Sequence, residues 1–188
     1  TTTATGSSAN PSVFGQSVTL TATVTGATPT GTVTFNDGAS ALCTAVALAS
    51  GQAPCVTSAL GVATHSITAI YSGDGNNIGS TSPALSQVVN KANTSTVIGA
   101  HTPNPSTVGS PIAVSAAVSV TAPGAGTPGG AVTVSDGSAS CVITLPATSC
   151  NLTPVSPGAK TLTATYAGNG SFSASVSAGV AHTVNSSS

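Results

Sequence analysis

The chain has 188 residues, and only five of them carry a formal charge: two Lys and three Asp, with no Glu or Arg, while Ser and Thr supply 60. Nucleic acid and anionic lipid both bind through several basic side chains, so this composition excludes both as partners. Mean hydropathy of +0.37 and a net charge of −1 are also unlike disordered chains, and no apolar run approaches the ~20 residues needed for membrane insertion.

The first half of the chain alternates with a period of two, which is typical of half-buried strands. Residues 18–25 alternate apolar positions with Thr, and residues 32–35 repeat the pattern before Asn36-Asp37-Gly38, a hairpin-turn signal. Residues 67–71 supply a third apolar face and end at Tyr71. No segment has helical spacing, and Gly or Pro interrupts every stretch of about ten residues. An all-β fold is therefore predicted.

The second half repeats the first. Three segments occur twice, 94 to 99 residues apart: Asn10–Ser12 and Asn104–Ser106, Gly31–Gly38 and Gly130–Gly137, Ile67–Gly75 and Leu162–Gly170. We therefore predict two domains, residues 1–91 and 92–188, with Lys91 in the linker. About seven short strands in each repeat favour an immunoglobulin-like Greek-key β-sandwich. Because 188 is twice 94, we expect the chain to be a whole number of periods from a longer array, or a unit that stacks head to tail.

Four cysteines fall in two pairs, one pair in each half: Cys43 with Cys55 and Cys141 with Cys150. Zinc sites need closer spacing, such as C-x₂-C, so two local disulfides are the better interpretation. Such short separations predict bridges that join neighbouring strands or a hairpin, and not the two sheets of a sandwich. Disulfides in turn indicate an oxidising, extracellular setting.

The remaining polar residues are better explained by structure than by chemistry. Asp37-Gly38 and Asp136-Gly137 are predicted hairpin turns, and Tyr71 and Tyr166 are predicted core or corner residues at the ends of equivalent strands. Asp74 resembles part of a calcium loop, but calcium prefers several carboxylates and this loop offers one. We therefore predict a turn there, with no metal site and no cofactor.

Catalysis requires titratable groups that converge, and the repeats do not preserve any such set. His65 aligns with Lys160, and His65 and Asp74 are expected at opposite ends of one strand. His101 and His182 have no partner nearby in sequence and are expected to be exposed. The sequence therefore predicts that the protein is not an enzyme.

The motifs resemble the bacterial Ig-like domain repeats of large surface proteins. The resemblance rests on Asn-Pro-Ser-x-x-Gly at 10–15, Gly-Thr-Val-Thr-Phe-x-Asp-Gly at 31–38 and His-Ser-Ile-Thr-Ala-x-Tyr-Ser-Gly-Asp-Gly-Asn at 65–76, and it covers the chain twice. Repeat two departs from it at Val134 and Asn169. The resemblance implies an Ig-like fold, a secreted or cell-surface location, and a role as stalk, adhesin or extracellular fibre, without a shared catalytic site.

We expect a structural module that stacks with neighbouring copies of the same repeat, because so few charges leave little repulsion between copies. One alternative is an adhesin or carbohydrate-binding module, for which three Phe and two Tyr provide little aromatic surface. A glycan or host-surface ligand is thus unsupported by the sequence. Another alternative is a spacer attached to a secreted enzyme.

Overall fold

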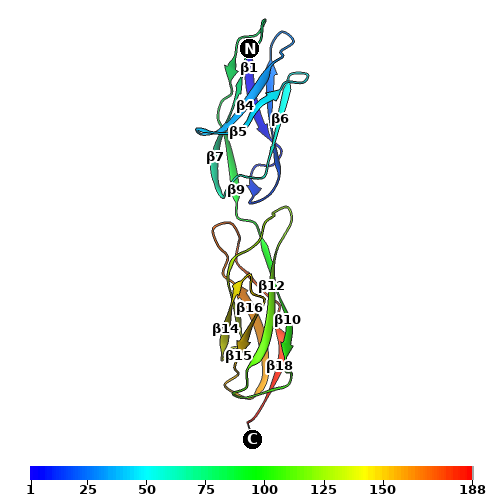
Figure 1. The fold of residues 1–188 in the computed structure, drawn as a ribbon, viewed down its shortest axis with the longest axis vertical. Helices are drawn as coiled ribbons and strands as arrows, with labels where there is room; N and C mark the ends of the chain where they lie inside the picture. The colour runs from blue at the N-terminus through cyan, green and yellow to red at the C-terminus, as the bar shows by residue number, and fades with distance from the viewer. Residues whose placement is uncertain (188) are drawn as a thin grey trace. The chain divides into compact units, whose positions relative to one another are not determined.

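The computed structural model describes residues 1–187, and no helix occurs among them (Figure 1). The chain forms two compact units, Thr1–Asn90 and Lys91–Ser188, whereas the predicted division falls after residue 91. The strands of unit 1 are β1 (Thr2–Ser7), β2 (Ser12–Val13), β3 (Val18–Thr25), β4 (Thr32–Asp37), β5 (Ser40–Ala47), β6 (Gln52–Thr57), β7 (Ala63–Tyr71), β8 (Ser80–Thr81) and β9 (Leu85–Asn90). The strands of unit 2 are β10 (Thr94–Thr102), β11 (Ser106–Thr107), β12 (Ile112–Val120), β13 (Gly130–Ser135), β14 (Ser140–Leu145), β15 (Ser149–Leu152), β16 (Gly158–Tyr166), β17 (Ser175–Val176) and β18 (Val180–Asn185).

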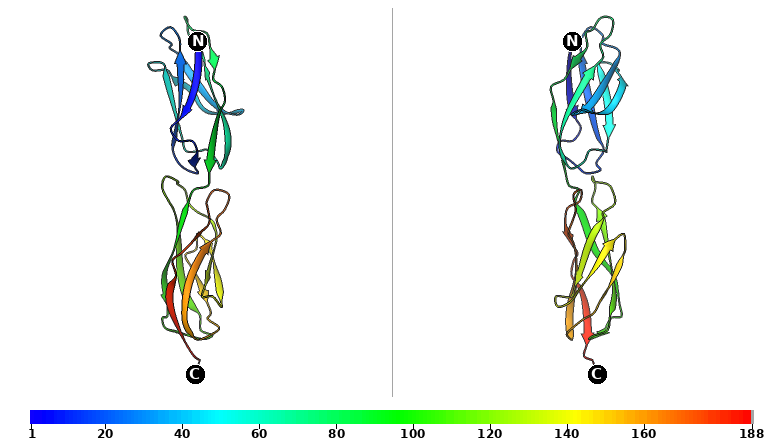
Figure 2. Two further views of the ribbon diagram at one scale, coloured as in Figure 1. Left: turned by 180° about the vertical axis from the view of Figure 1, so that it is seen from behind. Right: turned by 60° about the vertical axis from the view of Figure 1, so that its left-hand side comes forward.

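Each unit is a sandwich of a smaller and a larger sheet (Figure 2). In unit 1 the sheets have the strand orders β1-β3-β6 and β2-β9-β7-β4-β5, with β8 also paired to β7. Unit 2 repeats this arrangement as β10-β12-β15 and β11-β18-β16-β13-β14, with β17 paired to β16. All pairings are antiparallel except β2 with β9 and β11 with β18. The predicted all-β fold of two tandem Ig-like sandwiches is confirmed.

The cores follow the alternation seen in the sequence. In β3 the apolar side chains are buried and the threonines face outward or lie at the surface, because successive residues of a strand point to opposite faces. The inward residues of unit 1 include Val18, Leu20, Ala22, Val33, Phe35, Ile67 and Ala69. Their counterparts in unit 2 include Ile112, Val114, Ala116, Val132, Val134, Leu162 and Ala164. Val134 replaces Phe35, and unit 2 additionally buries Ile143.

Unit 2 begins before its first strand. Ala92 is fully buried and forms a parallel bridge with Phe172. Its N–H donates to the Ser171 carbonyl, and its own carbonyl accepts from the Ser173 N–H. The residue that follows Lys91 is therefore part of the core of unit 2.

Candidate functional site

One edge of each sandwich is closed by a disulfide. Cys43 of β5 bonds to Cys55 of β6, and Cys141 of β14 bonds to Cys150 of β15; the Cα atoms are 6.0 Å apart in both. In each pair the two strands belong to different sheets. These bridges were predicted to join neighbouring strands or a hairpin and not the two sheets; the bonded strands are consecutive along the chain, but the prediction that the sheets are not connected was wrong. The short connection between the two strands crosses from one sheet to the other. Cysteines only 12 or 9 residues apart are therefore bonded across the sheets.

The opposite edge of each sandwich is closed by hydroxyl groups. In unit 1 the Thr3 and Ser80 hydroxyls are 2.7 Å apart, and the Thr5 hydroxyl donates to Ser82 at 2.9 Å. In unit 2 the hydroxyls of Thr94 and Thr96 both contact Ser175, at 2.8 and 2.7 Å. These contacts join β1 to β8 and to Ser82, which directly follows β8, and they join β10 to β17. Each repeat is therefore held at both edges, once covalently and once by hydrogen bonds.

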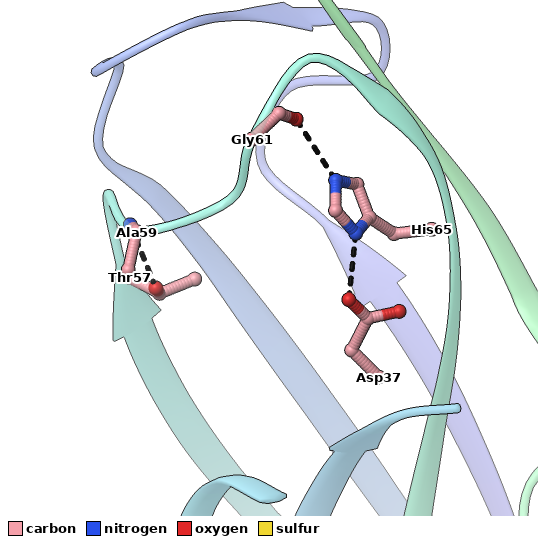
Figure 3. Close-up of polar contacts among 5 residues, drawn as sticks. All are labelled: Asp37, Thr57, Ala59, Gly61 and His65. Atoms are coloured by element: carbon pink, nitrogen blue, oxygen red, sulfur yellow. Dashed lines mark hydrogen bonds and ion pairs between the residues drawn. The ribbon is translucent and has the colours of Figure 1, made fainter. Parts of the chain in front are cut away.

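The last residue of β4 pairs with a histidine of β7, a contact that the sequence did not predict. His65 Nδ1 lies 2.6 Å from Asp37 Oδ2, and His65 Nε2 lies 2.9 Å from the Gly61 carbonyl (Figure 3). A carboxylate and a carbonyl only accept hydrogen bonds, so the protonated ring, in which both nitrogens donate, satisfies both contacts. Burial works against this charge, but the bonds to Gly61 and Asp37 outweigh it and raise the pKa of His65 above 6.5. Gly38 follows with a φ of +54°, which glycine adopts without strain.

The equivalent residues of unit 2, Asp136 and Lys160, do not contact each other in this way and have other partners. Asp136 is buried, and its Oδ1 accepts from the backbone N–H groups of Ser138 and Ala139 at 2.7 and 2.6 Å, across the turn that Gly137 forms. Lys160 occupies the position of His65 but donates to the hydroxyls of Ser156 and Ser138. Asp136 thus holds a turn, whereas the Asp37 carboxylate contacts the His65 ring.

Asp74 anchors the loop after β7. Its carboxylate accepts hydrogen bonds from six donors: the Thr30 N–H and hydroxyl, the Tyr71 hydroxyl, the Asn76 and Asn77 N–H groups and the Asn77 side-chain amide. The Thr30 and Asn76 N–H groups are the main cause of a pKa of Asp74 well below its ordinary range. Donors surround the oxygens that calcium would need, so this loop is a turn.

The two tyrosines are buried at equivalent positions, the ends of β7 and β16. The Tyr71 hydroxyl shares its one proton between the Thr30 carbonyl at 2.7 Å and Asp74 at 3.0 Å; burial, and then the hydrogen bond with Asp74 and its charge, raise the pKa of Tyr71. The Tyr166 hydroxyl donates to the Gly129 carbonyl at 2.9 Å, and burial raises its pKa. Both rings therefore tie the loop before the adjacent strand to the core.

The expectation that His101 and His182 are exposed was wrong for both, and His182 is the more buried of the two. Its side chain is 2% exposed, its Nε2 is 2.8 Å from the Ser106 hydroxyl, and its ring meets that of the half-buried His101 edge to face at 5.3 Å. Burial, and then His101, lower the pKa of His182 against the opposing influence of Asp136. The register places Gln87 at the same position in unit 1, where its amide bonds the Ser12 hydroxyl.

The alternation of the sequence with a period of two could have predicted that His182 and Gln87 are buried. His182 lies midway between Val180 and Val184, and Gln87 lies midway between Leu85 and Val89. In a strand, residues two apart share a face. Both polar residues are therefore on the apolar face, and each needs a hydrogen-bond partner there.

A groove lies at the same place in each unit, where β3 or β12 meets the connection between the two disulfide-linked strands. In unit 1 it measures about 530 Å³ and is lined by Val24, Thr25, Gly26, Thr28, Pro29, Thr30, Ser50 and Gly51. In unit 2 it measures about 220 Å³ and is lined by Ala116, Ala117, Val118, Thr127, Pro128, Leu145, Pro146, Ala147 and Thr148. Neither lining includes a titratable or aromatic side chain, so these grooves offer no acid, base or stacking platform.

Across residues 1–187, no three His, Cys, Asp or Glu side chains gather as a metal ion would require. Within the same residues, no helix is long and apolar enough to cross a membrane. The polar groups brought together by the fold are those that hold turns and sheet edges. The arrangement defines a pair of Ig-like β-sandwich modules.

The chain belongs to the bacterial Ig-like domain (group 3) family, whose model matches residues 4–90 and 99–185. A comparison with curated protein sequences gives no match. Among solved structures, the chain is similar to the Yersinia pseudotuberculosis adhesin InvE (16% identity, TM-score 0.43, covering 97% of this chain and 58% of that one). It is also similar to the fibronectin(III)-like modules of Clostridium thermocellum CbhA (14% identity, TM-score 0.39, covering 97% and 92%). At these identities the likeness concerns the fold alone.

Proposed function

We propose that this chain is a structural module of an extracellular repeat protein, in which tandem Ig-like domains build a stalk or fibre. The observation that carries the proposal is that the chain repeats one complete sandwich, with its own core and its own closures at both edges. A domain that is closed in this way folds as an independent unit, and tandem copies then extend the chain. The family of bacterial Ig-like domains supports the same role.

The two disulfides support an extracellular location, because reducing conditions inside cells disfavour such bonds. A domain whose core consists mainly of Val, Ala, Ile and Leu gains a substantial share of its stability from such a bond. The Ser and Thr that dominate the surface keep the chain hydrated without ionic groups.

We further propose that the module is not an enzyme. Each of the three carboxylates already has partners inside its own unit: Asp37 has His65, Asp74 has six donors, and Asp136 has two backbone N–H groups. These partners come from strands as well as loops of the same unit. A catalytic acid or base must instead face a space that a substrate can enter.

Neighbouring copies of the repeat are the partners that we propose. With two Lys and three Asp in 188 residues, adjacent copies repel each other little. Electron microscopy of the native material tests the proposal: we expect long rods or fibres whose axial period matches one or two Ig-like domains. Compact particles without such a period would contradict it.

A carbohydrate-binding adhesin is the alternative, and the aromatic side chains weigh against it. Tyr71, Tyr166, Phe35 and Phe172 are all buried, and Phe14 is half-buried, so they form no exposed stacking platform. Retention of the chain on an immobilised glycan surface would favour this alternative. A spacer in a secreted enzyme fits the same fold, and the sequence of the parent protein would identify it.

A further inference from the structure

The free edges of the two larger sheets differ. The last strand is β5 in unit 1 and β14 in unit 2, and no other strand within residues 1–187 pairs with either along its outer side. In unit 1 the pairing of β4 with β5 is interrupted by two register shifts, and Ala45 of β5 has a positive φ of +51°. Such irregularities are a common protection of edge strands, because they bend the edge away from a flat partner.

Strand β14 has no such protection. All six of its residues pair with β13 in one unbroken register, from Ser140 opposite Ser135 to Leu145 opposite Gly130. The segment contains no Pro and no charged residue, two further devices that natural edges use. The Cys141–Cys150 disulfide ties β14 to the other sheet, so the edge is held in place.

The backbone of β14 presents a row of hydrogen-bonding groups to solvent. Opposite residues of an antiparallel pair alternate between hydrogen-bonded and non-hydrogen-bonded, and the Asp136 N–H donates to the Ala139 carbonyl. Ala139 is therefore in a hydrogen-bonded pair, and so are the residues two and four positions further on, Cys141 and Ile143, whose backbone groups bond to β13. The N–H and C=O groups of Ser140 and Val142 therefore point away from the sheet.

The side chains at this edge are also suited to pairing. Ser140, Val142 and Thr144 are exposed and share the outer face, and Val142 is 55% exposed. The alternate residues Cys141, Ile143 and Leu145 point toward the core. A strand added here would extend the sheet and cover Val142 without disturbing the interior.

We propose that the β14 edge of unit 2 pairs antiparallel with the β14 edge of a second copy of this chain. The pairing deepens the proposed stalk function, since it would join stalks side by side. A two-fold axis at Val142 places Val142 against its counterpart, and Ser140 against Thr144. Apolar β-branched pairs are favourable in this position, and no like charges meet.

Because β14 carries no charged residue, a second copy of this chain is the partner that suits this edge best. A basic or acidic peptide would bring a charge to an edge that has no ionised partner for it. An identical edge brings the same uncharged, β-branched strand, and a two-fold interface needs only one self-complementary patch. Homopolymeric or bundled stalks would present many such edges together.

The test is sedimentation equilibrium of the full chain, residues 1–188, over a concentration series under non-reducing conditions. We expect a reversible monomer–dimer equilibrium. Val142→Lys would place two ammonium groups opposite each other and weaken the dimer by at least about tenfold. Thr44→Lys is the matched control, since Thr44 also follows the edge-strand cysteine and is exposed in the protected β5; it should leave the equilibrium unchanged.

Hydrogen exchange supplies a second measurement that does not depend on a variant. The amides of Ser140 and Val142 should exchange more slowly as the protein concentration rises, while exposed amides of β5 do not change. A chain that stays monomeric throughout the series, or a dimer equally sensitive to Thr44→Lys and Val142→Lys, would overturn the pairing. Neither result affects the stalk proposal, which rests on the repeated sandwich and is tested separately by electron microscopy of the native material.

Discussion

Removing the disulfide of unit 1 tests whether the intersheet bond supplies the stability that its position suggests. The change is Cys43→Ala together with Cys55→Ala, which opens a loop of 12 residues in the unfolded chain. Chain entropy gives a loss of about 3 kcal/mol in the free energy of unfolding of unit 1. For a domain of this size, that corresponds to a fall in Tm of roughly 12–24 °C.

The matched change in unit 2, Cys141→Ala with Cys150→Ala, opens a loop of 9 residues and should cost nearly the same, about 3 kcal/mol. Two-dimensional NMR during guanidinium unfolding reads the two units separately through their own amides. Each double variant should lower the midpoint of its own unit and leave the other unchanged, because distant sites are additive. A loss below about 1 kcal/mol in either unit would refute the reasoning.

Three further predictions concern single side chains. His182 has a lowered pKa, so unit 2 should lose stability as pH falls through 6.5 toward that lower value, and His182→Gln, the residue of unit 1, should flatten the acid limb of a Tm–pH profile. His65 has a raised pKa, so its contribution to unit 1 is complete below pH 6.5 and is lost as pH rises through the raised value; His65→Ala should remove this alkaline loss, and a persisting loss would contradict the ion pair. Asp74→Ala removes the acceptor that orders its loop, so hydrogen exchange at Asn76 and Asn77 should speed up while the amides of β7 stay protected; unchanged exchange would show that the loop does not need the carboxylate.

The sequence was sufficient for the fold because the relevant signals are local. Alternation with period two identifies the inward residues of β3, β4 and β7, since burial of one face is decided residue by residue. The repeated motifs identify two domains, because a repeated pattern of buried and turn positions specifies the same sandwich twice. The lone carboxylate at Asp74 likewise favoured a turn from the sequence alone.

Only the tertiary structure decided which strands meet. The sheet to which β6 belongs depends on how the chain folds over after Ser50, so the bond expected between neighbouring strands or in a hairpin joins the two sheets. Asp37 and His65 are 28 residues apart and meet because β4 and β7 pair in a register that sets Asp37 opposite Ile67. Edge status is a property of the whole sheet, so only the complete strand order shows β14 to be unprotected where β5 is not. Local periodicity specifies faces, whereas pairing across long separations depends on the packing of the entire domain.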